Sequence, residues 1–114
     1  MAVIEPAARL RESEAAQRFE PLSAGIYRLR SPLTFATVAA LRSPGLRLIA
    51  AAGTELALEL AEVPAIDSAG LALLIDWLAA ARARSCRLSY PKPPGALLSL
   101  ARLSEVEALL VPKT

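Results

Sequence analysis

Residues 55–84 combine two hydrophobic periods, and this stretch constrains the fold more than any other part of the chain. In residues 55–63 leucines alternate with charged or small residues, the period of a half-buried strand, and Pro64 then ends the run. Residues 69–84 place apolar side chains at helical spacing instead. A strand that leads through a short loop into an apolar helix predicts an α/β fold.

The remaining elements follow the same alternation. Strands are expected at residues 26–30 and 86–90, and helices at residues 34–42 and 97–103. Thr34 is the expected cap of the first helix, and Pro44-Gly45 predicts a break or a second short helix over residues 46–51. This order indicates helices packed on a sheet whose strands are at least partly parallel.

The N-terminal stretch carries no clean apolar stripe. We expect residues 1–17 to form a loosely ordered tail, or a helix that forms only against another surface, and residues 18–114 to form the domain. With 114 residues the chain has room for one core.

Charge and hydropathy exclude several kinds of partner. The net charge is only +2 and the basic residues are scattered, which argues against nucleic acid. No apolar stretch approaches the roughly 20 residues needed to span a bilayer, and charged residues interrupt the N-terminus where a signal peptide would be apolar. The single cysteine, Cys86, excludes an internal disulfide. We therefore expect a cytoplasmic protein without a membrane span.

The residues that carry most enzyme chemistry are missing. The chain has no histidine, which removes histidine-based triads and most zinc sites. Its two aspartates, Asp67 and Asp76, do not form a converging pair, and its five glycines are isolated, so no phosphate-binding loop is present. We expect no metal, no cofactor, no nucleotide site and no catalysis.

One junction stands apart from the rest. Asp67 and Ser68 open the helix, where unpaired N–H groups and partial positive charge favour an oxygen ligand. Either residue can simply cap the helix. Alternatively, Ser68 can accept a phosphate or meet an oxygen of a partner, while Gly70 lets another backbone come close.

The helix after this junction is apolar nearly all round. One stripe faces the sheet, and it comprises Leu71, Leu74, Ile75, Leu78 and Ala81. Leu73 and Trp77 lie on a different side of the helix. They either pack on a neighbouring helix or form a face for a partner.

Residues 66–74, Ile-Asp-Ser-Ala-Gly-Leu-Ala-Leu-Leu, resemble the signature of STAS domains, and the resemblance extends over about residues 25–110. That family includes anti-sigma-factor antagonists and the STAS subunit of the bacterial phospholipid-trafficking ABC transporter. The resemblance implies a mixed β-sheet packed on one side by helices. It also implies that the junction faces a partner, through Thr34, Asp67, Ser68, Ala69, Gly70, Leu71, Leu73 and Trp77.

The apolar run from Gly70 and the turn around Thr34 resemble the transporter branch more closely. For that branch the resemblance implies a non-enzymatic subunit that binds and regulates the ATPase subunit, together with the permease, and so lies at the inner membrane. The alternative is an anti-sigma-factor antagonist that is switched by phosphorylation of Ser68. A third interpretation is a stand-alone domain that binds a small molecule or forms a homodimer through the Trp77 side.

Overall fold

The computed structural model describes residues 10–110, and a sheet of four strands lies at its centre. The strands lie side by side in the order β1-β2-β3-β4. They are β1 (Phe19–Ser23), β2 (Ile26–Leu29), β3 (Glu55–Glu59) and β4 (Arg87–Ser89). β1 runs antiparallel to β2, whereas β2, β3 and β4 are mutually parallel, so the sheet is mixed.

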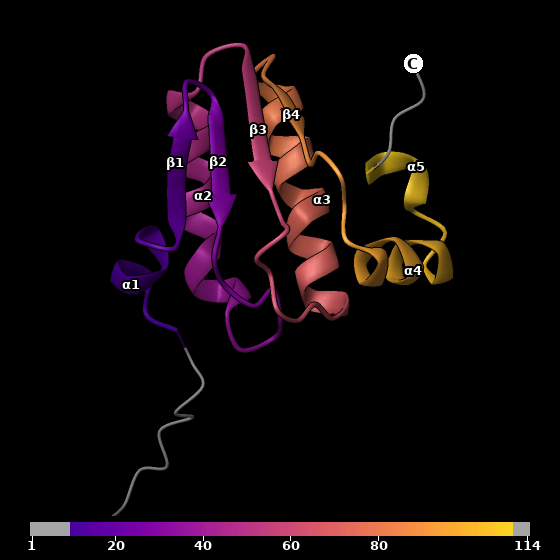
Figure 1. Cartoon of the computed structure of the whole chain (residues 1–114). Helices are drawn as coiled ribbons and strands as arrows, with labels where there is room; N and C mark the ends of the chain where they lie inside the picture. The colour runs from indigo at the N-terminus through magenta and orange to yellow at the C-terminus, as the bar shows by residue number, and fades with distance from the viewer. Residues whose placement is uncertain (1–9, 111–114) are drawn as a thin grey trace, which may run out of the picture.

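Two long helices cover one face of this sheet, as Figure 1 shows. They are α2 (Val38–Ala51) and α3 (Ser68–Ala83), which follow β2 and β3 as crossovers to the next parallel strand. The short helix α1 (Glu12–Ala16) packs on α2, and α4 (Gly95–Leu103) contacts α3. The last helix is α5 (Glu107–Leu110). The predicted α/β class, with helices on one side of a mixed sheet, is confirmed.

The strand alternation decides which face the helices cover. Leu56 and Leu58 of β3 are buried under them. Glu20, Arg28 and Glu59 form a row on the opposite face, because they are paired positions on three adjacent strands. Arg28 Nη2 lies 3.1 Å from Glu59 Oε1 in that row. The open face is therefore polar, and partner-binding apolar surface has to be sought elsewhere.

Two expectations about the first half of the chain are wrong. The first long helix begins at Val38, not at Thr34, and it runs without a break through Pro44 and Gly45. Both residues of that pair are buried on α2, so tertiary packing outweighs the proline penalty. The sequence reading also missed β1, whose Pro21 is tolerated because β1 is an edge strand.

Other element boundaries also differ from the expected residues. β3 ends at Glu59, whereas the strand was expected to reach residue 63, and residues 60–66 form a turn and loop. α3 and β4 lie within two residues of their expected ends. Within the expected N-terminal tail, the part from residue 10 onward includes α1, with Ala15 buried against the core. Residues 1–9 lie outside the described residues, and the boundary after residue 17 stays a prediction.

Candidate docking site

Asp67 is the cap that joins the β3–α3 loop to α3. Its backbone is extended, and its Oδ1 accepts hydrogen bonds from the N–H groups of Ala69 at 2.9 Å and Gly70 at 3.1 Å. These bonds satisfy two of the donors that a helix start leaves without a partner. The capping role expected for Asp67 is thus confirmed, and the anion position at this helix end is already filled by the chain's own carboxylate.

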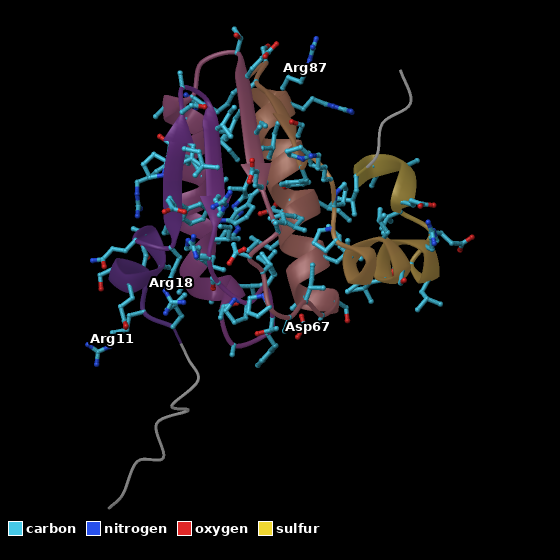
Figure 2. The ribbon with its side chains drawn as sticks, viewed as in Figure 1. Arg11, Arg18, Asp67 and Arg87 are labelled. Carbon is cyan, nitrogen blue, oxygen red and sulfur yellow. The ribbon has the colours of Figure 1, made fainter. Side chains whose placement is uncertain are left out.

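The same carboxylate also binds a second segment, the turn of residues 31–37. The Phe35 N–H donates to Asp67 Oδ2 at 2.9 Å. Beside it, Leu33 and Ile66 form a parallel bridge, in which the Asp67 N–H donates to the Leu33 carbonyl at 3.1 Å. The turn before α2 and the start of α3 are therefore fastened together, and Figure 2 shows Asp67 at the end of the molecule opposite Arg87.

These hydrogen bonds set the charge state of Asp67. The Phe35 N–H has the largest effect and lowers the pKa of Asp67. Burial has the next largest effect and opposes it, and the N–H groups of Gly70 and Ala69 lower the pKa further, so that it lies below its ordinary value. All three donors favour the ionised carboxylate. Asp67 is therefore an anion that holds two backbone segments in place.

Thr37, and not Thr34, organises the turn. Its buried hydroxyl donates to the Pro32 carbonyl at 2.6 Å and accepts from the Thr34 N–H at 3.1 Å. Thr34 is half-buried, and its carbonyl accepts from the N–H groups of Thr37 and Val38. The structure thus brings Thr34 next to the α3 start, but as a turn residue.

Gly70 does permit a close backbone approach, and the approaching backbone belongs to this chain. A Cβ on Gly70 would lie 1.9 Å from the Leu33 carbonyl oxygen. The position is buried. The expectation that Gly70 admits a partner is therefore replaced by a contact between α3 and the turn before α2.

Three predicted contact residues lie in the core. Leu71, Leu73 and Trp77 are 4%, 5% and 1% exposed. The Trp77 ring packs edge-on against the Phe19 ring, with 5.9 Å between the ring centroids. Its Nε1–H donates to the Arg42 carbonyl of α2 at 3.2 Å. Of the two readings of this side of the helix, packing on the neighbouring helix is correct, and a dimer through Trp77 is disfavoured.

What remains exposed at this end is a small apolar surface that the sequence reading had not identified. Phe35 is 78% exposed, and Ser68 is exposed beside it on the first turn of α3. Ala39 and Ala72 are exposed one helical turn before Arg42 and Asp76, which form an ion pair of 3.0 Å between α2 and α3. We call the surface made by Phe35, Ala39, Ser68 and Ala72 the Phe35–Ser68 face.

The exposure of Phe35 was not predicted, because the helix expected over residues 34–42 includes Phe35 as one of its apolar residues. Its position after the Ser-Pro-Leu-Thr turn carries no signal that separates an exposed aromatic from a buried one. Of the predicted partner residues, only Ser68 is exposed on this face, with Ala69 and Asp67 half-buried beside it.

Residues 10–110 offer neither a metal-ligand cluster nor a membrane-spanning helix. No cluster of three or more histidine, cysteine or acidic side chains is placed to hold a metal ion there. Within the same residues, no helix has the length and apolar character to cross a membrane.

The sequence matches a protein family, and the structure resembles a solved structure. The sequence matches the family described as "Mlab, STAS domain" over residues 20–112. The structure resembles that of the anti-sigma factor antagonist SpoIIAA in its unphosphorylated form, with a TM-score of 0.57 and 18% identity, over 75% of this chain and 80% of that chain. No curated protein matches the sequence. The likeness to SpoIIAA shows the fold, and the family match spans most of the chain. The chain therefore belongs to the STAS domain family, in the group described as Mlab.

Proposed function

We propose that this chain is the STAS subunit of an inner-membrane ABC phospholipid transporter, and that it binds and regulates the cytosolic ATPase subunit without catalysing a reaction itself. The observation that carries the docking role is the Phe35–Ser68 face, where an aromatic side chain is 78% exposed on a rigid turn. The family match supports the transporter branch. Attachment to the membrane would then come through the ATPase and the permease.

The face has the properties of an interface centre. Phe35 stands on a backbone that is fixed by its bond to Asp67, so little conformational freedom is lost when a partner covers the ring. Burying a phenylalanine side chain contributes about 1.5–3 kcal/mol, and aromatic anchors at the centre of an interface carry much of its binding free energy.

The surroundings of Phe35 define the partner surface it fits. Ala39 and Ala72 are short enough for a partner backbone to come close, and the Ser68 hydroxyl offers one hydrogen bond. The nearest charge is the Asp67 carboxylate, which already accepts hydrogen bonds from the N–H groups of Phe35, Ala69 and Gly70. The next charges, on Arg42 and Asp76, form an ion pair across α2 and α3. We expect the ATPase to present an apolar pocket for Phe35 with a polar group at its rim, and no cluster of charge.

A phosphorylation switch at Ser68 is the second candidate, and the exposure of Ser68 favours it. The geometry predicts whether phosphorylation would strengthen or weaken docking. The N–H groups of Ala69 and Gly70 are already bonded to Asp67, so a phosphate on Ser68 would add a charge of about −1.5 to −2 beside that carboxylate without finding those donors free. Phosphorylation would therefore weaken the docking of an apolar partner.

The experiment is an affinity purification of the tagged protein from native membranes, with wild type, Ser68→Arg and Ser99→Arg. Ser99 is an exposed serine on α4, which makes it a matched control. Recovery of an ABC ATPase and permease with wild type and Ser99→Arg, but not with Ser68→Arg, supports the proposal. Recovery of a soluble serine kinase in place of the transporter contradicts it and favours the switch.

A further inference from the structure

A groove opens at the β4 edge of the sheet, away from the Phe35–Ser68 face. Its volume is about 760 Å³, and the C-terminal half of α3, strand β4 and α5 line it. Cavities of about 300–1,000 Å³ are the size that holds small molecules. The groove is therefore large enough for a ligand.

Apolar side chains face the groove from three elements. Ile75 and Leu78 of α3 and Leu88 of β4 are half-buried, and Leu109 of α5 is 52% exposed. β4 is an edge strand of three residues, so among the described strands none extends the sheet beyond it. The walls are therefore apolar surface that residues 10–110 leave partly uncovered.

The charged residues that line the groove have one sign. Arg82 of α3 and Arg87 of β4 both line it, and no acidic residue is among the lining residues that the structure describes. Arg82 lies in the last turn of α3, where a cation complements the helix dipole, but this reason does not apply to Arg87 on a strand. Arg87 contacts Glu55 only at 3.9 Å, with both side chains largely exposed, so an anionic ligand can compete for it.

We propose that this groove binds a single-chain anionic amphiphile of the fatty-acid class, taken up as a free monomer. The acyl chain lies between Leu78, Leu88 and Leu109, where it covers apolar surface that is now exposed. The carboxylate lies against Arg82, and Arg87, whose side chain extends toward Glu55 on the other face of β4, adds positive charge at the rim. This assignment combines the apolar walls with the positive charge and does not depend on the identity of the protein partner.

Two substitutions on α3 separate this groove from the docking face. Ala79 and Ala72 are both exposed, and Ala79 lines the groove whereas Ala72 belongs to the Phe35–Ser68 face. The two positions are seven residues apart, which is about 10 Å along the helix. Ala79→Trp fills the groove, and Ala72→Trp is the matched control on the same face of the same helix.

The test is calorimetric titration of the full chain with laurate below its micelle concentration. We expect binding by wild type and Ala72→Trp, a loss of affinity of tenfold or more with Ala79→Trp, and a similar loss with the double variant Arg82→Glu/Arg87→Glu. Arg102→Glu, which changes an exposed arginine of α4 outside the groove, keeps wild-type affinity. Thermal unfolding of each variant verifies that it is folded.

Several results overturn the proposal. The proposal fails if the wild type does not bind laurate, or if Ala79→Trp binds laurate with the same affinity as the wild type. Binding to phosphatidylglycerol vesicles without binding to monomeric laurate assigns the groove to a membrane surface. A concentration-dependent dimer that Ala79→Trp abolishes assigns it to a second copy of the chain. If laurate binds only after residues 111–114 are removed, the occupant of the groove is the C-terminal end of the chain itself. In each case the pull-down with Ser68→Arg is unaffected, so the docking proposal is tested separately.

Discussion

The Cα of Gly70 lies so close to the Leu33 carbonyl that a Cβ there would lie 1.9 Å from its oxygen. The same oxygen accepts the Asp67 N–H at 3.1 Å. The first turn of α3 and the turn before α2 are thus in direct backbone contact. Together with the bond from the Phe35 N–H to Asp67, this contact places Phe35 next to the first turn of α3, where Ser68 lies.

Gly70→Ala is therefore expected to destabilise the fold strongly. Two backbone segments would have to separate and their hydrogen bonds would stretch, at a cost of about 3 kcal/mol. Urea unfolding measures the change. Gly95→Ala is the control, because Gly95 begins α4 and a Cβ there meets no atom within 4 Å. That variant should match or slightly exceed wild type, and equal midpoints for the two variants would contradict the contact.

Comparing Asp67→Ala with Asp67→Asn distinguishes the contribution of the capping hydrogen bonds to stability from that of the carboxylate charge. Alanine removes all three hydrogen bonds and should cost about 1–2 kcal/mol, while asparagine is itself a good cap and should cost less. The pKa of Asp67 is lowered in the folded state, so its ionisation stabilises the fold above the unfolded pKa of about 3.9. That contribution is lost as the pH falls through the lowered pKa.

The difference in stability between wild type and Asp67→Asn should consequently shrink between about pH 5 and pH 2. Urea midpoints measured across that range test the sign. A difference that stays constant with pH would show that the carboxylate charge contributes nothing to the fold.

Local pattern was enough to predict the central part of the fold. The alternation that begins at residue 55 and the helical spacing after Asp67 predict β3 and α3, although β3 ends four residues before the expected residue 63. β4 lies within the strand expected at residues 86–90. The cap of α3 could be narrowed to Asp67 or Ser68 because capping depends on the next three residues of the chain, and the structure shows that it is Asp67.

Features that depend on distant segments could not be predicted. Whether Trp77 faces α2 or a partner depends on Gly45, which lies 32 positions earlier and leaves the space that the indole fills. Phe35 is exposed because the helix begins at Val38, four residues after Thr34, and the turn before it is held by the bond from the Thr37 hydroxyl to the Pro32 carbonyl. Neither relationship has a local signature.

Gly45→Ala tests the contact with Trp77. In an isolated helix this change would stabilise by about 1 kcal/mol. Here the new Cβ would lie 2.3 Å from two atoms of the indole, so we expect a loss of about 1–3 kcal/mol instead. Combining it with Trp77→Phe, which shortens the ring system, should give a double variant at least about 1 kcal/mol more stable than additivity predicts. Additive losses in urea unfolding would place the two residues out of contact.

Tyr90→Phe tests a buried hydroxyl. Tyr90 O–H donates to the Leu74 carbonyl at 2.6 Å, and burial, with a smaller effect of Asp76, raises the pKa of Tyr90 well above its ordinary value. The neutral phenol therefore stabilises the fold below the unfolded pKa of about 10, and this contribution is lost as the pH rises further. Tyr90→Phe should cost about 1 kcal/mol at neutral pH, and the gap to wild type should narrow above pH 10. A gap that widens there would contradict the assignment.

Phe35→Ala, compared with Leu103→Ala, tests whether exposure or position makes an apolar side chain a docking residue. Phe35 is 78% exposed and Leu103 is 84% exposed, so both variants should change the free energy of unfolding by less than about 0.5 kcal/mol. Only Phe35 lies on the face that includes Ser68. Phe35→Ala should therefore weaken binding to the purified ATPase by about 2 kcal/mol, roughly 30-fold, while Leu103→Ala leaves it unchanged.

The measurement is a binding titration against the immobilised ATPase, with thermal unfolding of both variants as the check on folding. Phe35→Ala leaves the hydrogen bond from its backbone N–H to Asp67 in place, so the turn and the α3 cap should persist. A loss of affinity with an unchanged melting temperature then reports the ring alone. Equal affinity of the two variants would move the interface elsewhere on the molecule, because no other side chain of the Phe35–Ser68 face is large enough to anchor a partner.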